Sequence, residues 1–165
     1  MPLEQQLDLS LRLVVAAILS GIVGYDREQH DHPAGLRTHI LIGIGAALFT
    51  VLSMYAFAQA DQARVAAQIV TGIGFLGAGA IVQGRRPYNV YGLTMAAGIW
   101  SVAAIGMACG TGNYLIGVVG AILIWFVLAV LRRLEPDSKR PDSAEILPAG
   151  PPRENSVAKP RTRGH

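Results

Sequence analysis

The sequence has little charge, and its middle has almost none. Only 15% of its 165 residues are charged, whereas 52% are apolar. Between Val65 and Leu131 the only ionised side chains are Arg85 and Arg86. This scarcity of charge over a long stretch is typical of a membrane protein.

Cysteine and enzyme motifs are also scarce. Cys109, the single cysteine, excludes an internal disulfide and gives no cysteine-based metal or redox spacing. No nucleophile elbow, zinc-binding helix motif or phosphate-binding loop occurs, so we expect no catalytic residue, no cofactor and no enzyme activity. Residues 1–8 carry Glu4 and Asp8 and no Lys or Arg. A signal peptide needs a basic front end, so we expect the first apolar stretch to stay as a helix.

Five apolar stretches are each long enough to cross a hydrocarbon core about 30 Å thick, which takes roughly 20 helical residues. They cover residues 7–24, 39–57, 65–82, 90–108 and 114–131. Because the linkers are short, consecutive helices must run antiparallel. The sequence therefore predicts an all-α polytopic membrane domain of five helices over residues 1–134.

Lys and Arg in the linkers predict the orientation. Arg27, Arg37, Arg85, Arg86 and the basic start of the tail fall on one side, which places the N-terminus outside and the C-terminus in the cytoplasm. The tail, residues 135–165, is rich in proline and polar residues and is predicted to be disordered. It lacks the interleaved aromatic residues typical of nucleic-acid binding, so we expect no nucleic-acid partner.

Residues 71–80 read TGIGFLGAGA and contain the Gly-x-Gly-x-x-Gly pattern of a dinucleotide-binding turn. That turn needs a preceding strand and an acidic residue about 20 positions later, and neither is present. On a helix, Ala67, Thr71, Gly74 and Ala78 form a stripe of small residues instead. Small residues let helices approach closely in lipid, so we predict that this helix lies at the centre of a tight bundle. The predicted packing residues are Gly72, Gly74, Gly77 and Gly79.

Polar side chains within or near the apolar stretches are candidates for function. No Asp or Glu lies near the middle of any stretch, which argues against a proton-coupled pump. Asp8 and Arg12 are four residues apart, which favours a local ion pair. The first linker holds Asp26, Glu28, His30, Asp31 and His32, but no metal-ligand spacing is diagnostic, so a solvated loop is favoured over a metal site.

Four blocks of sequence resemble the N-terminal membrane domain of the MgtC/SapB family of bacterial inner-membrane proteins. They are GYDRE at 24–28, AGLRTH at 34–39, the run from Gln68 through GIGFLGAG to Gly79, and GLT at 92–94 followed by Ala96, Ala97 and Trp100. The resemblance implies a five-helix membrane domain. Its family members are associated with growth under magnesium limitation and, in some pathogens, survival inside host cells.

Carried over position by position, the resemblance implies a polar functional cluster. Its members are Asp26, Arg27, Glu28, Arg37, Thr38, His39, Gln68 and Thr94. Relatives commonly have Glu where Asp26 stands and Thr where Met95 stands, and many continue into a folded cytoplasmic domain. Arg27 and Arg37 lie at the ends of neighbouring helices, so we expect them to approach Asp26 and Glu28.

Two function classes remain open. The favoured one is a regulatory or interaction protein that contacts other membrane proteins, or copies of itself, within the bilayer. The alternative is a small channel or transporter subunit for Mg²⁺ or another cation. Five helices are few for an alternating-access carrier, and no inverted repeat is evident.

Overall fold

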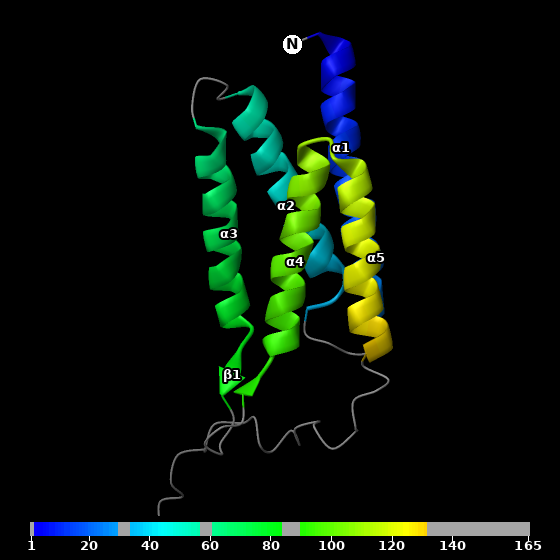
Figure 1. The fold of residues 1–165 in the computed structure, drawn as a ribbon, viewed down its shortest axis with the longest axis vertical. Coiled ribbons are helices and arrows are strands. Elements are labelled where there is room, and N and C mark those ends of the chain that lie inside the picture. Colours follow the sequence, from blue (N-terminus) through cyan, green and yellow to red (C-terminus); the bar gives the residue numbers. More distant parts are fainter. Residues whose placement is uncertain (1, 30–33, 57–60, 84–89, 132–165) are drawn as a thin grey trace, which may run out of the picture.

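The structure, a computed structural model, describes residues 2–29, 34–56, 61–83 and 90–131. Within these residues the chain forms five helices that run alternately up and down (Figure 1). Their bounds are α1 Leu3–Glu28, α2 Leu36–Tyr55, α3 Gln62–Gly79, α4 Leu93–Gly110 and α5 Tyr114–Val130. The all-helical bundle agrees with the predicted fold class, whereas the predicted disordered tail lies outside the described residues.

Three of the helices, α1, α2 and α4, are long and apolar enough to cross a membrane, while α3 and α5 are shorter apolar helices. The predicted stretch 65–82 continues past the end of α3, and the stretch 90–108 begins before α4, because the chain between α3 and α4 forms a small hairpin. Strand β1 (Val82–Gln83) pairs antiparallel with β2 (Val90–Tyr91). Gly92 follows β2 with φ of 87°, a left-handed conformation that favours glycine, and α4 begins at the next residue.

Helix α2 packs between α1 and α4 through contacts that only glycine permits. A Cβ atom at Gly43 would overlap the Ser20 hydroxyl of α1, and one at Gly106 of α4 would overlap the carbonyl oxygen of Gly43. One turn further along each helix, a Cβ atom at Gly110 would lie 2.8 Å from the carbonyl oxygen of Ala47. Small residues of α2 and α4 therefore bring these two helices into close contact.

Helix α3 does not lie at the centre of the bundle, and this prediction was wrong. It lies at the edge, beside α4 (Figure 1). Of its four glycines only Gly77 packs, with a Cβ position 3.6 Å from Ala96 of α4, and nothing lies within 4 Å of Gly72, Gly74 or Gly79. The opposite, aliphatic side of α3 faces the bundle, where Ile69 is buried. Helix α3 thus meets α4 through Gly77 at Ala96. Val70 and Ile73 of α3 line a pocket together with Ala103 of α4, while the other three glycines of α3 are left outside.

Candidate functional site

The end of the bundle where α1 and α3 end and α2 and α4 begin is here called the signature end. There the side chain of Glu28, the last residue of α1, reaches the start of α2. Its Oε2 accepts a hydrogen bond of 2.7 Å from the backbone N–H of Leu36. The first N–H groups of a helix lack partners within the helix and carry partial positive charge, so a carboxylate stabilises them. Glu28, at the end of α1, therefore acts as a cap for the start of α2.

This cap gives a direct prediction. Replacing Glu28 by Ala should lower the free energy of unfolding by about 1 kcal/mol, the usual value of a helix cap. Glu28→Gln keeps an oxygen that accepts the same hydrogen bond and should retain most of the stability. The comparison requires thermal unfolding of both variants in the same detergent. Equal losses in the two variants would show that charge, and not the hydrogen bond, is what matters.

His39 is the most buried polar residue at the signature end, with 1% of its surface exposed. Its ring nitrogen Nδ1 lies 2.9 Å from the carbonyl oxygen of Gly35. The glycine in the family-like segment GYDRE explains how such a large residue fits, because a Cβ atom at Gly24 would lie 2.8 Å from the Cβ of His39. Gly24 thus makes the room that the imidazole occupies between α1 and α2.

The other polar residues of this end differ in how deeply their side chains are buried. Arg27 is buried, with 4% of its surface exposed, and its charge acts on the imidazole of His39. Asp26 is half-buried and, like Arg27, has an interaction partner. Arg37 is exposed and Thr38 is half-buried. Thr94 is exposed in the first turn of α4 and therefore belongs to the same end of the bundle.

Gln68 is not part of this cluster. It lies six residues after the start of α3, which begins at the opposite end of the bundle. The rise of about 1.5 Å per residue puts it about 9 Å from that opposite end. Its side chain is exposed. Seven of the eight predicted residues thus lie at the signature end, and Gln68 lies elsewhere.

No group of three His, Cys, Asp or Glu side chains is arranged to hold a metal ion within the described residues. His30, Asp31 and His32 of the first linker lie outside them, so a metal site that uses these residues is not tested by the structure. The residues that are described at the signature end include one imidazole, which is turned inward.

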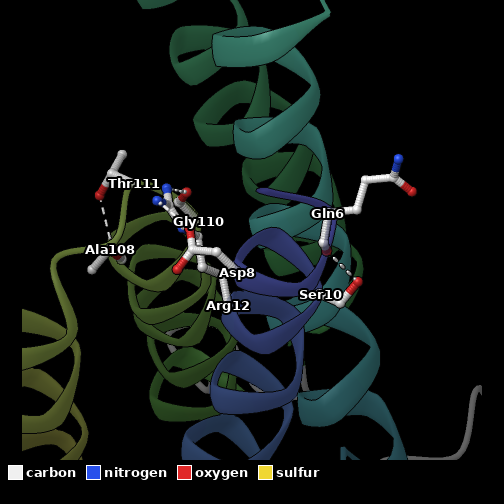
Figure 2. Close-up of polar contacts among 7 residues, drawn as sticks. All are labelled: Gln6, Asp8, Ser10, Arg12, Ala108, Gly110 and Thr111. Carbon is white, nitrogen blue, oxygen red and sulfur yellow. Dashed lines mark hydrogen bonds and ion pairs between the residues drawn. The ribbon is translucent and has the colours of Figure 1, made fainter. Parts of the chain in front are cut away.

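The opposite end of the bundle, called the clamp end here, holds a contact that the sequence did not reveal. Arg12 of α1 donates hydrogen bonds from Nε and Nη2 to Oδ2 of Asp8, at 3.0 and 2.8 Å. It also donates from Nη1 to the carbonyl oxygen of Gly110, the last residue of α4, at 3.1 Å (Figure 2). Its guanidinium carbon lies 5.6 Å from the ring centre of Tyr55, the last residue of α2.

The predicted pair of Asp8 and Arg12 is therefore present, but Arg12 does more than pair locally. It connects α1 to the final residues of α2 and α4, which it contacts through Tyr55 and Gly110. The last carbonyl groups of a helix lack partners within the helix and attract positive charge. The four-residue spacing of Asp8 and Arg12 was visible in the sequence, whereas a contact across 98 residues gave no signal there.

Comparison with known proteins supports the family resemblance that the four sequence blocks indicate. The MgtC family model matches residues 13–136, which is most of the chain. The chain belongs to the MgtC family. No solved structure matches it.

Several curated relatives of this MgtC-family protein are 40–47% identical to it. A protein of Escherichia coli K12 named "Putative magnesium transporter YhiD" is 47% identical over 132 residues, covering 75% of this chain and 60% of YhiD. Protein MgtC of Brucella abortus strain 2308 is 44% identical, covering 74% of this chain and 50% of that protein. Protein MgtC of Salmonella typhimurium is 42% identical, covering 74% and 52%. The chain thus spans about half to three fifths of the length of these relatives.

Proposed function

We propose that this MgtC-family protein is a regulatory or interaction protein of the bacterial inner membrane that serves adaptation to magnesium limitation. Family membership supports a magnesium-related membrane protein. The distribution of Lys and Arg in the sequence supports an orientation with the N-terminus outside and the signature end in the cytoplasm. The proposal assigns no catalytic residue and no cofactor.

The observation that carries this proposal is the outward face of α3. Ala67, Thr71, Gly74 and Ala78 follow one another along the helix, and all four are exposed. Small residues on a lipid-facing helix gain nothing from lipid, but they allow another helix to approach closely. Gln68 lies on the same exposed side and can hydrogen-bond across a helix contact. This face suits another membrane protein or a second copy of the chain.

A cation channel or transporter subunit is the second candidate, because the name of YhiD describes a magnesium transporter. Two observations weigh against it. The acidic residues of the five helices, Glu4, Asp8, Asp26 and Glu28, lie near the two ends of α1, so none is in the middle of a helix. Helix α2 is also in close contact with α1 at Gly43 and with α4 at Gly106, which leaves little room for an ion path between these helices.

The two candidates are separated by one matched pair of variants and one flux measurement. Gly74→Leu places a large side chain on the outward face of α3, and Gly45→Leu places the same side chain on α2. Neither position has an atom within 4 Å of its Cβ, so both variants should fold. Growth of a deletion strain at low Mg²⁺ is then compared at equal protein abundance. Mg²⁺ entry into sealed liposomes that contain the purified protein is measured with an internal indicator.

We expect Gly74→Leu to abolish growth support, Gly45→Leu to retain it, and the liposomes to show no Mg²⁺ entry above protein-free controls. Full growth with both variants would contradict a role for the α3 face. Saturable Mg²⁺ entry would replace the regulatory proposal with transport.

A further inference from the structure

The imidazole of His39 has one satisfied nitrogen and one without a partner. A carbonyl oxygen only accepts hydrogen bonds, so the contact of Nδ1 with the Gly35 carbonyl places the ring hydrogen on Nδ1. In the neutral ring Nε2 is then an acceptor. Nε2 is buried and the structure gives it no hydrogen-bond partner. A neutral imidazole tolerates this environment better than a charged one, because burying an unpaired charge costs much more free energy.

The described neighbours of Nε2 on α4 and α5 are Gly98 and Leu128, which offer no side-chain hydrogen-bond acceptor. A Cβ atom at Gly98 of α4 would lie 4.0 Å from Nε2 and 3.8 Å from Cδ1 of Leu128 on α5. On the other side of the ring, Gly24 of α1 is in close contact with the Cβ of His39. The imidazole therefore lies where α1, α2, α4 and α5 meet.

Charged groups reach this position from α1 and α2 alone among the described residues. Helix α1 contributes Asp26, the buried Arg27 and Glu28, whose carboxylate is engaged at the start of α2. Helix α2 contributes Arg37, which is exposed. Helices α4 and α5 contain no Asp, Glu, Lys or Arg. A positive charge at His39 would thus be added at the end of the bundle that already buries Arg27.

We propose that His39 is a proton-sensitive latch for the signature end of the bundle. Its neutral ring lets α1, α2 and α4 pack together, and a proton on Nε2 loosens this packing. The proton creates a buried N–H donor without an acceptor and a charge that Arg27 repels. The latch responds to pH on whichever side of the membrane the signature end faces, and it does not depend on the choice between regulator and transporter.

The test is hydrogen exchange of the full chain in lipid nanodiscs between pH 8 and pH 5, corrected for the intrinsic pH dependence of exchange. Residues 36–43 at the start of α2 report on the latch, and residues 48–55 at the far end of the same helix serve as the internal control. A group that is neutral when folded and titrates near pH 6.5 when released should raise the opening constant by up to about tenfold per pH unit below that value. We expect this rise at residues 36–43 and not at residues 48–55. The same response at both ends of α2, or none at either, would overturn the proposal.

Two variants identify the group that is responsible. His39→Gln keeps a polar side chain that does not titrate and should make exchange at residues 36–43 independent of pH. Glu28→Gln removes the neighbouring carboxylate and should leave the response of the native chain in place. A response that survives His39→Gln would refute the latch, and one that disappears in Glu28→Gln would assign the response to Glu28. If His39→Gln does not fold, the comparison of exchange at the two ends of α2 in the native chain still tests whether the signature end opens at low pH.

Discussion

Replacing Gly106 by Ala should destabilise the bundle more than a single methyl group normally does. The new Cβ atom would overlap the carbonyl oxygen of Gly43, and a Cβ 3.0 Å away on Ala46 leaves little room to shift. A backbone atom cannot rotate away as a flexible side chain can, so α2 and α4 must separate along their contact. Overpacking of this kind costs about 1–3 kcal/mol, and here it exceeds the gain in helix propensity on replacing glycine by alanine. Thermal unfolding in detergent, followed by tryptophan fluorescence, measures the loss.

Gly45 provides the matched control for this experiment. It lies two residues from Gly43 on α2, and nothing lies within 4 Å of its Cβ position. Gly45→Ala should therefore be neutral or raise the unfolding temperature slightly through helix propensity alone. If Gly106→Ala and Gly45→Ala unfold at the same temperature, the close contact of α2 with α4 does not support the fold.

The sequence predicted the helices better than it predicted which faces they bury. Apolar runs of about 20 residues indicate helices because backbone groups in lipid must bond within their own segment. These apolar runs do not indicate which side of a helix faces the bundle and which faces lipid, since both sides are apolar. The glycine stripe of α3 shows this limit: small residues permit close packing, but the structure packs Ile69 inward and leaves Gly74 outside. The hairpin between α3 and α4 was missed because its strands are only two residues long.

The candidate site was predictable to a similar degree. Asp26, Glu28 and His39 lie at helix ends joined by a short linker, so their proximity follows from the antiparallel arrangement. The role of each side chain did not follow. The approach of Arg27 and Arg37 to Asp26 and Glu28 stays a prediction. The spacing gave no sign that Glu28 bonds to a backbone N–H of α2 or that Arg37 is exposed. Such choices depend on atomic positions that residue spacing cannot supply.

At both ends of the bundle, a charged side chain of α1 binds a helix end of opposite partial charge. At the signature end a carboxylate of α1 accepts a hydrogen bond from the backbone N–H of Leu36, the first residue of α2. At the clamp end a guanidinium of α1 donates to the carbonyl of Gly110, the last residue of α4. Helix ends of opposite partial charge thus bind side chains of opposite charge from one helix. Helix α1 thereby fixes the ends of its neighbours as well as packing against their sides.

Arg12→Ala should accordingly be the most damaging change at the clamp end. It removes the hydrogen bond to the Gly110 carbonyl, both bonds to Asp8 and the contact with Tyr55. The Arg12 side chain is only 13% exposed, so water replaces these partners incompletely. Hydrogen bonds that involve a charged group contribute about 1.5–3 kcal/mol, and we expect a loss in that range. Hydrogen exchange at residues 111–114, which join α4 to α5, should rise together with the loss of stability.

Asp8→Asn separates the local pair from the contact between helices. Asp8 is 49% exposed, so weakening its ion pair should cost less than about 1 kcal/mol. Arg12 would still donate to the Gly110 carbonyl, and exchange at residues 111–114 should stay close to that of the native chain. If Asp8→Asn instead destabilises the protein as much as Arg12→Ala, the local pair is the stabilising element and the bond to α4 contributes little. Arg12→Lys extends the comparison, because a single ammonium group cannot reproduce the planar fork that reaches Asp8 and Gly110 together.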